Sequence, residues 1–251
     1  MRRVFRTPLA AAALVFLPLP LLAQGRFPPD SLVNVKVFPK TMPVREVINT
    51  MRGFTGALGV RCDFCHVDTH QGEGLAAFNF PSDSLRTKRT ARLMMLMVQR
   101  INDSTLANIP ERPTPNVAVT CMTCHRGVSR PMPLDQLIGQ DLAAGGVDSA
   151  TAAYRALRQQ YYGRASYDFG EMTLVGVAFP LIEQHKGDDA LAMLRLNLEF
   201  FPNSAPTLAV MGDAYLSKAD TSDAIQMYRQ ALAKDPEARE AQMRLRQLGQ
   251  H

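Results

Sequence analysis

The sequence predicts a mainly α-helical protein built from two parts, and three observations support this prediction. The pentapeptide Cys-x-x-Cys-His occurs twice, at residues 62–66 and 121–125. Each copy follows a stretch in which apolar residues recur at helical spacing. From about residue 140 the chain is rich in Ala, Leu, Gln and Arg and repeats itself at a fixed interval. The expected fold is a pair of helix–turn–motif units in residues 24–135 and a helical repeat domain in residues 136–251.

The first 23 residues have the pattern of a secretory signal peptide. A basic start precedes an apolar stretch from Leu9 to Leu22, and Ala23 is the small residue expected at a cleavage site. Pro18 and Pro20 interrupt the apolar stretch, which is shorter than the ~20 residues that span a bilayer. We therefore predict that residues 1–23 are removed on export rather than kept as a membrane anchor.

The charge of the chain argues against nucleic acid as a partner. The chain has 28 Lys and Arg against 23 Asp and Glu, which gives a formal net charge of +5 and a pI of about 9.2. Three arginines belong to the leader, so the mature chain keeps 25 basic and 23 acidic residues and a net charge of +2. A balance this even predicts no nucleic-acid partner. Export places the mature protein in the bacterial periplasm, which is an oxidising compartment.

Both pentapeptides have the composition of a covalent haem attachment site. Two thiols separated by two residues lie on one turn and can add to the two vinyl groups of a haem, and the adjoining imidazole can bind the iron. Two motifs therefore predict two c-type haems. The residues assigned to covalent attachment and to the iron are Cys62, Cys65 and His66 in the first motif and Cys121, Cys124 and His125 in the second.

Other uses of the four cysteines stay open at this point. Two Cys-x-x-Cys pairs can form a four-thiolate zinc site. An exported chain with an even number of cysteines can form disulfides, and a single Cys-x-x-Cys is typical of thioredoxin-like redox pairs. None of these requires a His directly after the second cysteine, whereas both motifs have one.

The stretch before the first motif predicts an extended lead-in, a helix and a turn. Residues 33–39 alternate apolar and polar side chains, which indicates a short strand or extended segment. Pro43 then opens a helix, because proline is favoured in a first helical turn. Three glycines predict a flexible turn before Cys62: Gly53, Gly56 and Gly59.

Met51 is the candidate for the second axial ligand of the first haem. It shares the apolar face of the predicted helix with Val44, Val47 and Ile48, where its thioether could reach the iron from the side opposite His66. A six-coordinate c-type iron commonly takes His and Met. Met42 is the fallback ligand, and packing in the core is the other common use of a Met in an apolar stripe.

A second helix is predicted from about Leu85 to Asn102. Its apolar face holds Ala91, Met94, Val98 and Ile101. Met94, Met95 and Met97 are all candidate ligands for the second haem, and spacing alone does not separate them. The first half of the helix carries Arg86, Lys88, Arg89 and Arg92. Such a cluster is typical of a solvated face, although Arg92 and Arg61 are also candidate partners for haem propionates.

These residues together resemble the cytochrome c subunit of photosynthetic reaction centres. The similarity lies in residues 34–40, 57–66, 90–102 and 119–127, and so covers roughly residues 31–130. In that family each haem lies along a helix that supplies an axial Met and is followed by a turn and the attachment motif. The resemblance thus implies Met51 as a ligand of the first haem and Met94 as a ligand of the second.

Two features of the chain differ from that family. The reaction-centre subunit carries four haems, whereas this chain has two motifs. Many members are anchored to lipid through an N-terminal cysteine, whereas here both motifs together use all four cysteines.

The C-terminal part predicts tetratricopeptide-like repeats. Pro202 and Pro236 lie 34 residues apart, which is the period of those repeats. We expect a first unit from about Glu171, a second unit in which Gly212 lets paired helices approach, and a further helix at residues 237–248 that caps the stack. Such a domain either offers a concave surface to another protein or is a plain helical stack. We expect residues 140–251 to fold alone.

The function that these patterns favour is that of a periplasmic di-haem electron carrier rather than an enzyme. Its expected partners are redox proteins, a membrane-bound electron-transfer complex among them, and a protein that binds the repeats. A di-haem peroxidase is one alternative, and it requires an iron with an open or displaceable distal position. An assembly protein in which the haems are accessory is the other.

Overall fold

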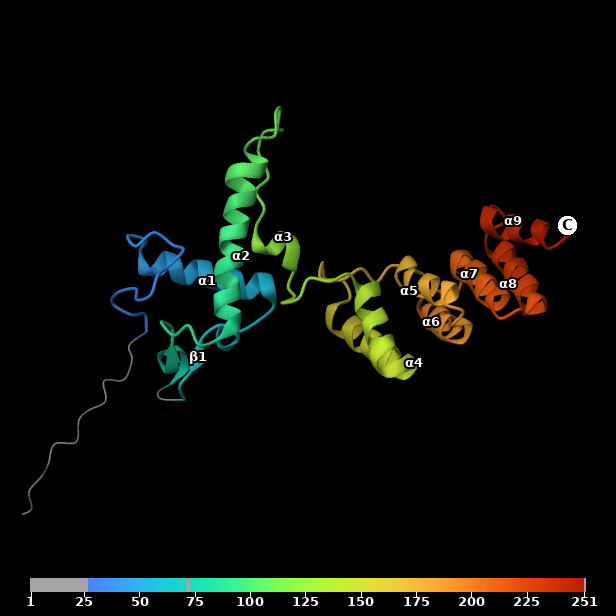
Figure 1. Cartoon of the computed structure of the whole chain (residues 1–251), viewed down its shortest axis with the longest axis horizontal. Coiled ribbons are helices and arrows are strands. Elements are labelled where there is room, and N and C mark those ends of the chain that lie inside the picture. Colours follow the sequence, from blue (N-terminus) through green and yellow to red (C-terminus); the bar gives the residue numbers. More distant parts are fainter. Residues whose placement is uncertain (1–26, 71–72, 251) are drawn as a thin grey trace, which may run out of the picture. The chain divides into compact units, whose positions relative to one another are not determined.

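The computed structural model describes residues 27–70 and 73–250, so the predicted leader lies outside the described residues. Nearly all of the regular structure in these ranges is helical (Figure 1), which confirms the mainly α-helical class. The described chain divides into two compact units. One holds Cys62–Met94 together with the described residues up to Ile48, and the other holds Asn49–Arg61 together with the described residues from Met95 onward.

Helix α1, Val44–Leu58, begins directly after Pro43 as predicted and has Glu46 in its first turn. It continues through Gly53 and Gly56, so the prediction of a three-glycine turn was wrong. Two isolated glycines cost a helix only about 1 kcal/mol each relative to alanine, which the packing of the apolar face can offset. Only Gly59 lies in the turn, with a φ of +66° that favours glycine.

Residues 33–39, predicted as a short strand or an extended segment, form no strand. Asn34 has a φ of +62°, and such a left-handed residue breaks the alternation that an extended segment requires. The strands of the described residues are β1, Val67–Asp68, and β2, Phe78–Asn79, which pair antiparallel with Val67 opposite Asn79. A 3₁₀ turn, η2 at Gly74–Ala77, precedes β2.

Helix α2, Arg86–Arg100, confirms the second predicted helix and passes into a π-helical stretch, η3, at Ile101–Leu106. A loop then leads to the second motif. That motif itself is helical and forms α3, Cys121–His125, whereas the first motif begins with a 3₁₀ turn, η1, at Cys62–Phe64.

The rest of the described chain is a series of six helices, α4 to α9 (Figure 1). Helix α4 is long and contains Gly146, whose φ of +75° and ψ of −173° kink it. The starts of α6 and α8, residues 187 and 221, differ by 34, as the sequence repeat requires. The bounds are α4, Leu134–Tyr161; α5, Met172–Glu183; α6, Gly187–Phe200; α7, Ala205–Ser217; α8, Thr221–Lys234; and α9, Arg239–Gln247.

One continuous apolar core joins these helices, and α4 belongs to it from its first residue. Leu134, Ile138 and Tyr154 are buried in the same cluster as the inward-facing side chains of α5 to α9. Gly212 of α7 lies against the ring of Tyr228 of α8, so close that a Cβ on Gly212 would be 2.4 Å from the ring. In the part of the chain that the structure describes, no helix combines the length and apolar character needed to cross a bilayer.

Candidate haem sites

The first motif places its two thiols on a single turn. The backbone N–H of Cys65 and the backbone N–H of His66 both donate to the carbonyl of Cys62, at 3.2 and 2.9 Å. The hydroxyl of Thr87, from α2, donates to the carbonyl of Phe64 and so fixes the turn from outside. Cys62, Cys65 and His66 therefore converge from one short segment, as covalent haem attachment requires.

His66 is half-buried and held as a neutral base. Its ring lies edge-on to the ring of Phe80, with the centroids 4.9 Å apart. Burial lowers the pKa of the imidazole below its ordinary value, and the positive charge of Lys88 lowers this pKa further. The Nδ1 atom is buried and has no hydrogen-bond partner. A neutral imidazole can donate a ring nitrogen to a metal at neutral pH.

A buried lysine, Lys88, holds the loop at residues 80–83 that carries Phe80. Lys88 is 9% exposed, and its ammonium donates to the carbonyls of Phe80, Pro81 and Ser82 at 2.7, 3.1 and 2.7 Å. It also lies 3.0 Å from the carboxylate of Asp83. These four contacts fix the backbone that carries Phe80, which is the residue in contact with the imidazole.

Asp83 is the common partner of three cations. Lys36 lies 3.0 Å and Arg92 2.7 Å from its carboxylate, in addition to Lys88. The neighbouring guanidinium of Arg92 and the other donors hold the pKa of this carboxyl well below its usual range. The basic first half of α2 is thus not simply a solvated face. Arg92 also donates to the carbonyl of Asn34, at 3.0 Å, and so joins the lead-in to α2.

The second motif is fixed at both ends. Before it, the side chain of Asn102 pairs with both backbone groups of Val119, each at 2.8 Å. The side chain of Thr123 accepts from the backbone N–H of Thr120 at 3.0 Å, within a capping box. After it, Arg126 takes a left-handed conformation, with a φ of +48°, and turns the chain back.

The imidazole of His125 has a defined tautomer. Its Nδ1 lies 2.9 Å from the carbonyl oxygen of Val128, which can only accept, so Nδ1 carries the proton. In the neutral imidazole with this tautomer, Nε2 is the nitrogen that can bind a metal. The N–H of Gly127 donates to the carbonyl of Ala57 at 2.9 Å. This approach requires Gly59, because a Cβ there would be 2.0 Å from the Gly127 oxygen.

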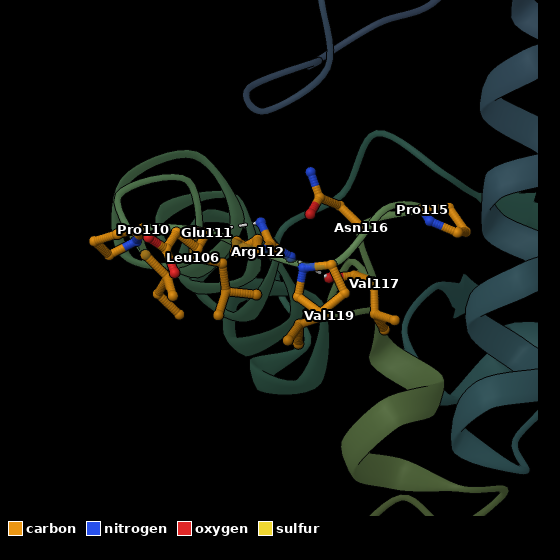
Figure 2. A pocket seen from close by; sticks show the side chains of 10 residues that line it. Leu106, Pro110, Glu111, Arg112, Pro115, Asn116, Val117 and Val119 are labelled. Carbon is orange, nitrogen blue, oxygen red and sulfur yellow. Dashed lines mark hydrogen bonds between the residues drawn. The ribbon is translucent and has the colours of Figure 1, made fainter.

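The loop between η3 and α3 surrounds a cavity of about 430 Å³ (Figure 2). The guanidinium of Arg112 bridges it by donating to the carbonyls of Leu106 and Val117, at 3.1 and 2.7 Å. Three prolines, Pro110, Pro113 and Pro115, lie in this loop, but nothing in their pattern indicates the bridge. Its effect is to fix the backbone that reaches the second motif.

The described cysteines give no support to any of the three alternative uses. All four are free thiols, which gives no support to disulfides. Burial raises the pKa of the Cys65 and Cys121 thiols, whereas a thioredoxin-like redox pair needs a thiol of lowered pKa. Among residues 27–70 and 73–250, no group of three or more His, Cys, Asp or Glu side chains lies close enough to hold a metal ion.

The residues present fit a haem in each motif. Each motif offers two thiols on one turn and an adjoining imidazole. Helix α2 also carries four large apolar side chains that are between 42% and 67% exposed, and a porphyrin requires such apolar surface: Leu93, Met94, Leu96 and Met97. The predicted ligand Met51 is half-buried on α1, one turn after the buried Val47. Assigning Met51 and Met94 to the irons remains a prediction.

The two turns have the residue types and the arrangement that a c-type cytochrome requires. Residues 30–141 match the family model of the photosynthetic reaction centre cytochrome C subunit. A photosynthetic reaction center cytochrome c subunit of Thermochromatium tepidum is 33% identical over 96 residues, which are 38% of this chain and 20% of that protein. The chain thus spans about a fifth of the length of this relative. The resemblance to the reaction-centre cytochrome family is confirmed for residues 30–141.

Proposed function

We propose that this chain is a periplasmic di-haem c-type cytochrome that passes electrons between redox proteins. The observation that supports it most is that each Cys-x-x-Cys-His motif places its two thiols and its imidazole on a single turn. A bound haem supplies an iron that gains and loses one electron without a change in the protein's bonds. Nothing in this proposal requires a catalytic residue.

The chain's own residues have three tasks in this function. Cys62, Cys65, Cys121 and Cys124 anchor the two haems. His66 and His125 would each bind an iron, and we propose Met51 and Met94 as the further ligands. A thioether ligand raises the potential and occupies the distal position, which disfavours a peroxidase. Absorbance with and without peroxide separates the two functions, because an open iron would change its spectrum and a Met-ligated one would not.

Intact mass after acid–acetone extraction tests the number of haems. We expect a mature chain that begins near Gln24 and retains the mass of two haems, since thioether bonds survive the extraction. A mass equal to the bare polypeptide would overturn the proposal. A chain with Cys121→Ser and Cys124→Ser should retain one haem and serves as the matched control.

We further propose that residues 136–251 form a tetratricopeptide-like domain that binds a protein partner. The helix spacing of 34 residues and the small residue Gly212 against Tyr228 support this architecture. The matched relative is by name a subunit of a photosynthetic reaction centre, and we propose a membrane-bound electron-transfer complex as one partner here. Pull-downs with the full chain and with a chain that lacks residues 140–251 test the domain. Equal recovery of partners by both would contradict it.

A further inference from the structure

One contact connects the C-terminal helices to the second motif. Ser166 lies in the connection between α4 and α5, beyond the end of the family match at residue 141. It is 6% exposed, and its hydroxyl donates to the carbonyl of Arg126 at 2.7 Å. Arg126 directly follows His125, so a residue outside the matched segment contacts the turn that holds the second imidazole.

That turn determines how His125 is held. The backbone N–H of Val128 donates to the carbonyl of His125 at 2.9 Å, and the carbonyl of Val128 accepts from Nδ1 of the imidazole. Between these two residues, the N–H of Gly127 is held by Ala57 and the carbonyl of Arg126 by Ser166. The Arg126 peptide is therefore the part of the turn whose orientation depends on Ser166.

The loop that carries Ser166 is itself held firmly against the helices. Tyr167 packs edge-on against Tyr161, with the ring centroids 5.2 Å apart. Phe169 is 6% exposed and packs against the buried Tyr154. The guanidinium of Arg158 donates to the carbonyl of Phe169 at 3.3 Å. Because these neighbours belong to α4 or to the core around it, Ser166 presents a fixed donor to Arg126.

We propose that Ser166 is a positioning residue for the second haem, through which the C-terminal helices set the hydrogen bond from His125 to Val128. This inference rests on the proposed function. A carbonyl that accepts from Nδ1–H makes the imidazole a stronger donor to its metal. A stronger donor stabilises the oxidised iron, so Ser166 keeps the potential of the second haem low.

Redox titration of Ser166→Ala in the haem-loaded full chain tests the inference. We expect the potential of the second haem to rise while that of the first haem stays at its wild-type value. Ser217→Ala is the matched control, because Ser217 also donates to a backbone carbonyl at 2.7 Å, that of Ala214, but lies in α7. It should change neither potential. Identical second-haem potentials in Ser166→Ala and Ser217→Ala would overturn the role of Ser166.

Hydrogen exchange in the wild-type protein gives a second measurement that requires no variant. The amides of Gly127 and Val128 should exchange at the rate at which residues 163–168 open, since Ser166 holds the turn closed. Exchange of residues 126–128 that is independent of residues 163–168 would also contradict the proposal. Failure of the proposed function is distinguishable from these outcomes, because a wild-type chain without two covalent haems is detected by mass before any titration.

Discussion

Met94 and Met97 both lie on the exposed side of α2, with 42% and 45% of their surface accessible. We predict that Met94→Leu lowers the potential of the second haem and changes the free energy of unfolding by less than about 1.5 kcal/mol, because Leu conserves volume and apolar character but cannot bind iron. Met97→Leu is the control and should leave both potentials unchanged. If Met97→Leu lowers a potential and Met94→Leu does not, then Met97 is the ligand.

A second prediction at the level of single residues concerns Lys88. Lys88→Met keeps the aliphatic stem but removes the donor to the carbonyls of residues 80–82. Leaving such groups unsatisfied should cost about 1–3 kcal/mol of stability. Arg86→Met, at an exposed position on the same helix, is the control and should cost little. Thermal unfolding of both variants measures the difference, and equal midpoints would show that the buried ammonium is not needed.

The carboxylate of Asp83 predicts a pH dependence. Because its pKa is depressed in the folded state, the unfolded chain binds a proton more readily, and folding stability falls when the pH drops below the ordinary carboxyl value of about 4. Above a pH of about 4, the contribution of the ionised Asp83 carboxylate to folding stability is fully present. Asp83→Asn should remove this part of the acid sensitivity in unfolding curves recorded between pH 5 and 2.5. An unchanged curve would assign the sensitivity to other carboxyls.

At this scale the sequence was informative where the chemistry is local. Two thiols and a His within five residues lie on one turn, so the local geometry of Cys62 to His66 and of Cys121 to His125 could be predicted from the pattern, whereas their attachment to haem stays a prediction. Lys88 and Ser166 could not, because their roles depend on partners brought together by tertiary packing. The sequence shows that Lys88 and Arg92 lie one helical turn apart. It does not show that both contact Asp83, because that contact depends on how the loop at residues 80–83 folds.

At the scale of the elements, the contact between α7 and α8 offers the sharpest test. A Cβ on Gly212 would lie 2.4–2.7 Å from three ring atoms of Tyr228, and this ring is held by its hydroxyl, which donates to Asp213 at 2.7 Å. Gly212→Ala should therefore cost about 1–3 kcal/mol through overpacking. Gly139→Ala, in α4 where a Cβ meets no atom within 4 Å, should be neutral or stabilising. Urea unfolding measures both, and equal losses would contradict the close approach.

Helix periodicity predicted the main elements well and their ends less well. The apolar faces of α1 and α2 are long enough to identify both helices. Gly53 and Gly56 were mistaken for a turn because a propensity of about 1 kcal/mol per glycine is overridden by the packing of a whole helix face. The short alternation at residues 33–39 carried too little information to exclude the left-handed Asn34.

At the scale of the whole molecule, the division predicted near residue 135 can be tested with fragments. Leu134 and Ile138 are buried in the core of the C-terminal helices, so a fragment of residues 140–251 lacks both. Each buried apolar side chain contributes about 1.5–3 kcal/mol. We expect residues 133–251 to unfold cooperatively at a clearly higher temperature than residues 140–251. Ile138→Ala in the longer fragment is the control and should reproduce part of the loss of stability, because it removes one of the two buried side chains. Equal midpoints of the two fragments would show that the first turns of α4 are dispensable.

Helix α4 has a consequence for how this chain could be recombined. The family match ends at residue 141, inside a helix that begins at Leu134 and continues to Tyr161. A chimaera joined at the end of the match would divide this helix between two parents and separate Ile138 from the side chains that cover it. The segment that matches the family and the helical core after it therefore overlap by about two helical turns. Neither part can be replaced by the corresponding part of another protein unless that protein supplies the whole of α4.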